Sequence, residues 1–363
     1  MGATVLVIGL GDLGTRVFDA LARLAEVERL VGAGRNEERG RARAGQTALV
    51  AELAGGPRHV GFEPLDLDDV AATASLLHRL EPEVVVVAAS RHTWWRPFAD
   101  ERVGTLPFGV WLPLQLVLVR RLMEARREAG IAARVVSLPY PDAVGPALAP
   151  LGLAPELGAG NVAETAPKLA LLAAQKAGVA REEVRVRLVM HHAAQRVAFR
   201  SLAGGREDEP PWAAEVLVRG ERLPHEDVER LFWAPWPLPQ GRDTHELSAA
   251  ATAHAVRVLL GEEPAATHAP APNGLPGGYP VRLSRRGVEL DLPPRLRPDE
   301  AIVLNERAAA FDGIERIERD GTVVFTGDVA AATERLLGLR LERVHPDEMD
   351  DVADELAARA SRR

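Results

Sequence analysis

The chain has 363 residues, a formal net charge of −8 and no cysteine. This length allows two domains with a sizeable apolar core, and the lack of cysteine excludes disulfides, thiol nucleophiles and thiolate metal ligands. Acidic and basic residues are mixed throughout, without the concentrated positive footprint that nucleic-acid binding requires, so we expect no nucleic-acid partner.

The chain starts in a predicted strand without a charged leader, which argues against a signal peptide. Its longest apolar stretch, residues 110–119, is too short to span a bilayer and contains Pro113. We therefore expect no membrane partner and a cytoplasmic location.

An apolar run at residues 5–8 leads directly into Gly9-x-Gly11-x-x-Gly14, and helix-type spacing of apolar residues follows. Gly9 permits a sharp turn, Gly11 leaves the backbone open to phosphate, and Gly14 lets the helix pack closely on the strand. The free N–H groups and the dipole of the helix start favour phosphate. The motif predicts a dinucleotide site, with a tight structural turn as the alternative. The expected phosphate-binding residues are Gly9, Gly11, Asp12, Leu13 and Gly14.

The second predicted strand, residues 27–33, ends at Gly34-Arg35-Asn36. In a dinucleotide fold this position faces the adenosine ribose, where an acidic residue selects NAD. Here the acid is missing, and Arg35 offers a counter-charge for a 2′-phosphate. The segment predicts NADP as the cofactor, with NAD as the alternative. A solvated arginine at a turn is the other interpretation of Arg35.

Further strands are predicted at residues 60–64, 83–89 and 134–138, with helices between them. The strand at 83–89 is uninterruptedly apolar, which is typical of a sheet buried on both faces. Strands that alternate with helices predict an α/β fold with a doubly wound parallel sheet over residues 1–150.

A loop rich in arginine and tryptophan follows the strand at 83–89. Ligands bind at the carboxyl ends of strands in such sheets, so we expect this loop to contact substrate or nicotinamide. Packing onto a neighbouring element is the alternative. The residues assigned here are Ala89 and Ser90 for the cofactor, Arg91, Trp94 and Trp95 for the substrate, and Arg96 for catalysis.

The pattern changes after Pro150. Helices are predicted at residues 162–177, 244–260 and 297–310, and strands or alternating segments at 184–190, 196–201, 214–218, 279–283 and 288–290. Residues 264–280 are expected to form an exposed loop. The predicted units are a dinucleotide-binding domain at 1–150, an α+β substrate domain at 151–310, and a C-terminal extension at 311–363 with one strand and two amphipathic helices.

With these elements in order, the chain resembles the lactate/malate dehydrogenase superfamily over residues 4–305. Beyond the glycine turn, residues 137–142 resemble the family's Asn-Pro-x-Asp segment, and residues 158–166 resemble the segment that carries its Leu-Asp-x-Ala-Arg motif. Residues 190–193 stand where the family has Gly-Glu-His-Gly, and Thr244 stands at its late active-site Thr/Ser. The resemblance implies a Rossmann domain, an NAD(P)-dependent oxidoreductase and a homodimer or homotetramer.

The spacing from Glu164 to His192 is close to the family's Asp-to-His spacing. Hydride transfer at a carbon–oxygen bond also moves a proton, and imidazole donates or accepts one near neutral pH. A carboxylate on the second ring nitrogen fixes the tautomer and orientation. We therefore predict His192 as the acid/base and Glu164 as its orienting carboxylate. A structural histidine at a strand end is the alternative.

Several departures from the family pattern change the expected substrate. Pro167 falls where the family has its carboxylate-binding arginine, and the adjacent Lys168 is a point charge without the planar fork. Leu138 replaces the family's asparagine, and Arg91 or Arg96 would stand in for its loop arginines. We expect a small-molecule hydroxy or oxo substrate other than simple lactate or malate.

Two alternatives keep the nucleotide fold. One is a nucleotide-binding sensor whose substrate site has decayed, and the other is a saccharopine- or opine-type amino-acid dehydrogenase. No metal site is expected, because the adjacent His191 and His192 would point to opposite faces of a strand.

Overall fold

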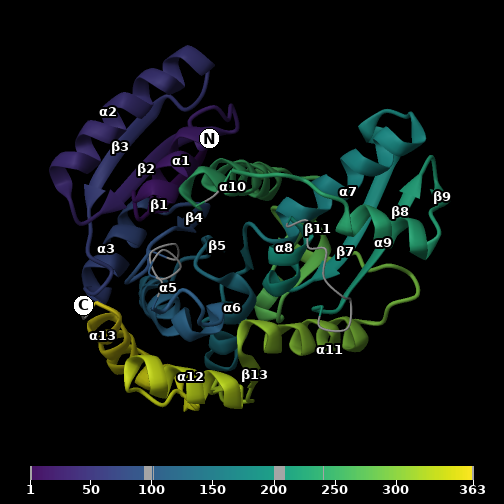
Figure 1. The fold of residues 1–363 in the computed structure, drawn as a ribbon. Helices are drawn as coiled ribbons and strands as arrows, with labels where there is room; N and C mark the ends of the chain where they lie inside the picture. Colours follow the sequence, from purple (N-terminus) through teal and green to yellow (C-terminus); the bar gives the residue numbers. More distant parts are fainter. Residues whose placement is uncertain (1, 94–99, 101, 200–208, 240, 362–363) are drawn as a thin grey trace.

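The structure is a computed structural model that describes residues 2–93, 100, 102–199, 209–239 and 241–361. Trp94, Trp95 and Arg96 of the predicted substrate loop lie outside the described residues. Three β-sheets and their helices make up the described part of the chain (Figure 1). No helix within it is long and apolar enough to cross a membrane.

The first sheet is parallel and has the order β3-β2-β1-β4-β5-β6. Its strands are β1 (Ala3–Ile8), β2 (Val27–Gly34), β3 (His59–Pro64), β4 (Val84–Val87), β5 (Arg134–Ser137) and β6 (Leu157–Gly158). The predicted doubly wound sheet is confirmed, and the short β6 adds a sixth strand to the predicted five. Strand order reverses at β1, and ligands of such sheets bind in the crevice outside the carboxyl ends of the strands at this point.

Helices cover both faces of this sheet, and alternate residues of each strand point to opposite faces, so both sets of side chains are buried. Val5 and Val7 of β1 pack with α1 and α10, whereas Leu6 and Ile8 pack with α3 and α5. The flanking helices are α1 (Asp12–Leu21), α2 (Glu37–Ala54), α3 (Val70–Leu80), α5 (Leu112–Ala129) and α6 (Pro141–Leu148).

The second sheet is antiparallel, with the order β10-β11-β7-β8-β9 and β12 paired to β11. Its strands are β7 (Val184–Met190), β8 (Trp212–Val218), β9 (Glu221–Arg222), β10 (Ala265–Pro270), β11 (Gly278–Ser284) and β12 (Gly287–Leu290). The associated helices are α7 (Val162–Ala177), α8 (His192–Ala198), α9 (His225–Trp233) and α10 (His245–Leu260). Figure 1 shows α10 lying between the two sheets, where it packs on α1.

Two expectations for this half were wrong. Residues 264–280 are not an exposed loop: they contain β10 and the start of β11, and Tyr279 is fully buried. β10 lies at the sheet edge, where the missing N–H of proline is tolerated. Of the segment expected at residues 196–201, residues 196–198 belong instead to helix α8, whose start is capped by the His191 side chain as it accepts from the N–H of Ala193.

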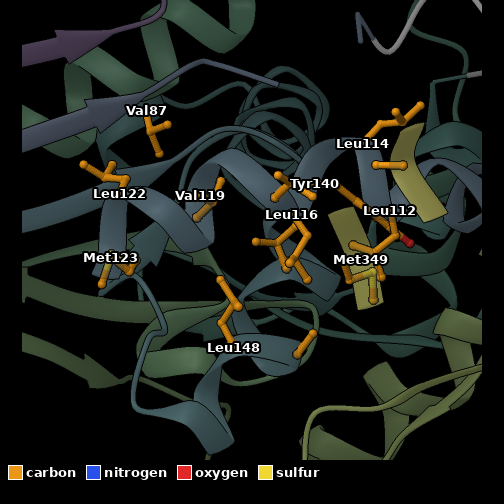
Figure 2. Packing of buried hydrophobic residues seen from close by; sticks show 14 of the residues in the cluster. Val87, Leu112, Leu114, Leu116, Val119, Leu122, Met123, Tyr140, Leu148 and Met349 are labelled. Carbon is orange, nitrogen blue, oxygen red and sulfur yellow. The ribbon is translucent and has the colours of Figure 1, made fainter. Parts of the chain in front are cut away.

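The C-terminal segment folds back onto the first sheet. It comprises α11 (Pro298–Ala309), the 3₁₀ turn η7 (Ala310–Asp312), β13 (Ile314–Ile317), β14 (Val323–Phe325), α12 (Gly327–Leu337), β15 (Arg343–Val344) and α13 (Met349–Ala360). α13 packs on α5, and Met349 belongs to the same apolar cluster as Leu112 and Leu116 (Figure 2). Arg121 of α5 also donates to Asp350 of α13 at 2.6 Å.

Leu356 tests whether α13 is an integral part of this core. It is fully buried in the cluster that contains the α5 leucines. Leu356→Ala should lower the free energy of unfolding by about 2–5 kcal/mol, because it removes buried methyl groups and leaves a cavity. Denaturant unfolding measures the change. The control Leu336→Ala, on α12 with 38% of the side chain exposed, should cost about 1 kcal/mol or less. Equal effects would show that α13 is only loosely attached.

Candidate functional site

The glycine turn after β1 has the geometry of a phosphate cradle. Gly9 has a φ of +96°, and a Cβ there would lie 2.8 Å from the backbone N of Ala89. A Cβ on Gly14 would lie 1.8 Å from the carbonyl oxygen of Gly9. At Gly11, in contrast, a Cβ would meet no described atom within 4 Å. Glycine is therefore required at two positions by packing, while the backbone at the third faces open space.

Helix α1 begins inside this turn. Its N-cap, Gly11, has no side chain to accept the first-turn N–H groups, which therefore remain available to an anion. The Asp12 carboxylate lies 2.6 Å from Nδ1 of His245 and 3.4 Å from Nε of Arg16. Burial raises the pKa of Asp12, but the hydrogen bond from His245 and the charge of Arg16 outweigh it, so the pKa is below its usual value. The negative charge of Asp12 is thus neutralised by its own neighbours.

A cavity of about 500 Å³ adjoins the turn at the end of β2. The predicted residues Gly34, Arg35 and Asn36 line it together with Arg39 and Arg43 of α2. None of the described residues that line the cavity is acidic. Arg43 is paired with Asp19 at 3.4 Å, and the Asn36 side chain caps α2 by accepting from the N–H of Arg39.

Arg39 and Arg43 were not among the residues predicted to bind the cofactor. Their spacing of four residues places them on one face of α2, and this signal was present once the helix had been assigned.

His192 begins α8, directly after β7. Its Nδ1 lies 2.6 Å from Oδ2 of Asp312, and its backbone N–H donates to Oδ1 of Asp142 at 2.9 Å. The ring packs against Phe108, with centroids 4.5 Å apart, and against Tyr140, at 5.3 Å. Asp142 lies in the first turn of α6, just after β5. His192 is therefore held at the carboxyl edge of the parallel sheet, the same edge that carries the glycine turn.

Asp312 is fully buried at the end of η7. Its Oδ2 also accepts from the hydroxyl of Tyr140 at 3.0 Å. This contact was not predicted, because Asp312 lies beyond the residues 4–305 that resemble the dehydrogenases. Asp-Gly at a helix end is typical of a turn.

The structure corrects the expected contact of Glu164. Its carboxylate accepts from Nε2 of Gln195 at 2.6 Å and from Oγ of Ser248 at 2.6 Å, while the nearby His192 has Asp312 on Nδ1. Glu164 thus joins α7 to α8 and α10, because those helices present donors within reach of its longer side chain. Burial raises the pKa of Glu164, and the hydrogen bonds and the neighbouring His192 offset this only in part.

No protein-family model and no curated protein sequence matches this chain. Among solved structures, the lactate dehydrogenase of Cryptosporidium parvum, complexed with lactic acid and NAD, is 16% identical with a TM-score of 0.56, over 86% of this chain and 96% of that chain. The malate dehydrogenase of Picrophilus torridus in its apo form is 15% identical with a TM-score of 0.57, over 86% and 98%. The chain has the fold of the lactate and malate dehydrogenases. The predicted resemblance is confirmed at the level of the fold.

Within this dehydrogenase fold, the predicted substrate lysine is used internally. Nζ of Lys168 donates to the carbonyl oxygens of Ala198 at 2.5 Å and Phe232 at 2.6 Å, so it bridges α8 and α9. The side chain is buried, and burial lowers the pKa of Lys168 to about 8. The structure therefore does not support Lys168 as a substrate ligand.

Arg91 is also engaged within the protein rather than directed at a substrate. Its guanidinium binds the Asp68 carboxylate with two hydrogen bonds of 2.6 and 2.8 Å, and Asp350 of α13 lies 3.5 Å away.

The remaining predicted residues have these positions. Ala89 packs against Gly9, Ser90 donates to the carbonyl of His92 at 2.8 Å, Leu13 is half-buried on α1, and Thr244 ends the 3₁₀ turn before α10. In the part of the chain that the structure describes, no group of three or more His, Cys, Asp and Glu is placed to hold a metal ion.

Glu164 predicts a pH-dependent stability. Because its pKa is raised on folding, the native state binds the proton more tightly than the unfolded chain, whose value is about 4.3. The associated stability is present below that value and is lost as the pH rises through the folded pKa. Glu164→Gln removes this loss. The melting temperature of the variant minus that of wild type should therefore be higher at about pH 8 than at about pH 5.

The matched control is Glu182→Gln, since Glu182 is exposed. It should show the same difference from wild type at both pH values. A Glu164→Gln difference that does not change with pH would contradict the assignment of Glu164 as a carboxyl group whose proton is stabilised by burial.

Proposed function

We propose that the protein is an NADP-preferring oxidoreductase that transfers a hydride between a nicotinamide cofactor and a hydroxy or oxo substrate other than simple lactate or malate. The observation that carries the proposal is that a glycine cradle and a hydrogen-bonded imidazole lie at one edge of the parallel sheet. A dehydrogenase needs both: a place for the cofactor and a group that moves the accompanying proton.

The residues present fit a dinucleotide. Gly11 and the first-turn N–H groups of α1 would hold the pyrophosphate, and the 500 Å³ cavity at the end of β2 would hold the adenosine ribose. Arg35 and Arg39 line this cavity without an acidic neighbour in its described lining, which favours a 2′-phosphate over a bare ribose. When bound, the nicotinamide supplies or accepts the hydride.

His192 moves the proton in this proposal. Because Nδ1 faces Asp312, exchange with the substrate oxygen takes place at Nε2. The Asp142 carboxylate accepts from the backbone N–H of His192 and so fixes the start of α8. A ring held in this way keeps one orientation while it gains and loses a proton, which is the requirement for general acid–base catalysis.

The altered environment of the substrate carboxylate supports a substrate other than lactate or malate. Pro167 has no cationic group to offer, Lys168 is bound to two backbone carbonyls, and Arg91 is bound to Asp68. None of these three provides the bidentate cation that recognises a small 2-oxo acid.

The cofactor preference is tested by fluorescence titration with NADPH and NADH. Arg35→Ala and Arg39→Ala should each weaken NADPH binding by about 10- to 100-fold, because each removes a hydrogen-bonded charge from the 2′-phosphate. NADH binding should stay unchanged. The control is Arg41→Ala on the same helix, whose side chain binds Glu37 and does not line the cavity. Equal loss for both nucleotides, or none, would refute the NADP preference.

The chemistry is tested by turnover, with NADPH and NADH, of a panel of oxo compounds that includes 2-oxo acids as well as ketones and aldehydes without a neighbouring carboxylate. We expect turnover of members other than pyruvate and oxaloacetate, because none of the three positions discussed above offers a bidentate cation to a 2-oxo carboxylate. His192→Ala should lower kcat by about 10²- to 10⁴-fold with little change in nucleotide affinity. The control is His78→Ala, an exposed histidine on α3, which should leave kcat unaltered. If the nucleotide binds and no oxo compound of the panel reacts, the protein is a nucleotide sensor instead.

A further inference from the structure

A carboxylate from the C-terminal segment faces the imidazole of His192. We infer that Asp312 is the positioning residue for His192: its carboxylate, in place of Glu164, fixes the tautomer of the ring and stabilises its protonated form. This inference rests on the proposed function, because it assigns a partner to the same acid/base. It also gives the C-terminal segment a part in the chemistry.

The burial of Asp312 is the first argument. An ionised carboxylate is costly to bury unless it receives hydrogen bonds or an opposite charge. Oδ2 of Asp312 accepts from the Tyr140 hydroxyl at 3.0 Å and lies 2.6 Å from Nδ1 of His192. A carboxylate at this distance holds a proton on Nδ1. The neutral ring is thereby fixed in the tautomer that carries its proton on Nδ1 and not on Nε2.

The neighbouring His191 does not compete for this role. Its Nδ1 lies 3.7 Å from Oδ2 of Asp312 and accepts from the N–H of Ala193 at 3.2 Å. A ring nitrogen that accepts a hydrogen bond carries no proton, so His191 cannot donate to Asp312 through Nδ1. Burial also lowers the pKa of His191, which keeps this ring neutral. Of the two adjacent histidines, His192 is the one bound to the carboxylate.

The alternative partner, Glu164, makes its hydrogen bonds to other side chains than His192. Gln195 donates to Oε2 and Ser248 donates to Oε1. The three acidic residues near His192 make different contacts. Asp142 accepts from the backbone N–H of His192, Glu164 accepts from Gln195 of α8, and Asp312 contacts the ring of His192.

The backbone of Asp312 is fixed by close packing. A Cβ on Gly109 would lie 2.5 Å from the carbonyl oxygen of Asp312, so the chain passes directly against the 3₁₀ turn η1 (Phe108–Trp111). The next residue, Gly313, has a φ of +87°, and a Cβ there would lie 2.5 Å from Val329 of α12. The same turn η1 carries Phe108, which packs on the His192 ring. The C-terminal segment and the ring are therefore held by one set of contacts.

The proton balance is simple. In the reducing direction, protonated His192 gives the proton on Nε2 to the substrate oxygen and becomes neutral, and in the oxidising direction it takes that proton back. Asp312 stays ionised throughout and keeps its hydrogen bond from Nδ1. It changes the energy of the protonated ring without exchanging a proton itself.

The test is Asp312→Asn in the full chain, measured in two ways. Turnover should fall by about 10²-fold or more, with unchanged NADPH affinity, because the amide no longer stabilises the protonated ring or enforces its tautomer. NMR titration of the labelled histidine rings should show the midpoint of His192 lowered by about one pH unit or more. A merely structural role of Asp312 would not move this midpoint in a variant that keeps the wild-type melting temperature.

Two further variants make the result decisive. Tyr140→Phe removes one hydrogen bond to Asp312 but keeps the carboxylate. It should shift the His192 midpoint in the same direction as Asp312→Asn, but less. This variant provides the test if Asp312→Asn does not fold. Glu164→Gln should also shift the His192 midpoint less than Asp312→Asn does. If Glu164→Gln shifts it more, or Asp312→Asn leaves it unchanged, the inference is wrong. If the wild type turns over no oxo compound, the proposed function fails, while the ring titration still decides the role of Asp312.

Discussion

The contact between the His192 imidazole and the buried Asp312 carboxylate joins three parts of the chain that are far apart in sequence. His192 follows a strand of the antiparallel sheet, Tyr140 follows a strand of the parallel sheet, and Asp312 belongs to the C-terminal segment. A buried carboxylate is stable only while its donors stay in place, so these parts must keep a fixed arrangement. Packing of α13 on α5 and of Gly313 against α12 supplies that rigidity.

A second set of hydrogen bonds connects the glycine turn after β1 to the helix that His192 begins. Asp12, in the turn, binds His245 of α10, and Ser248, one turn further along α10, donates to Glu164. Glu164 also accepts from Gln195, three residues after His192 on α8. Helix α10 thus fixes the position of the cradle relative to the ring. In this arrangement Glu164, which stands where the dehydrogenase pattern has its orienting carboxylate, organises the helices around the ring.

The parts of the fold that could be predicted are those with local signals. The glycine turn and the alternating strands and helices each depend on a short pattern whose physical meaning is independent of the rest of the chain. His192 was predicted from its spacing to Glu164 and from the family resemblance, and its role stays a prediction. Asp312 could not be predicted, because its partners lie 120 and 172 residues away and nothing near it in sequence indicates burial. The start of α8 was missed for a related reason: Asp142, 50 residues earlier, accepts the N–H of its first residue. Arg39 could have been predicted, since a helix was expected after the strand at residues 27–33 and α2 (Glu37–Ala54) occupies that place.

The most direct test of the whole account is a crystal structure of the complex with NADPH. The account predicts the pyrophosphate on the turn at Gly11, the 2′-phosphate between Arg35 and Arg39, and the nicotinamide ring at the carboxyl end of β4 beside the His192 imidazole. A nucleotide bound outside this crevice, or a nicotinamide ring separated from His192 by other side chains, would contradict it.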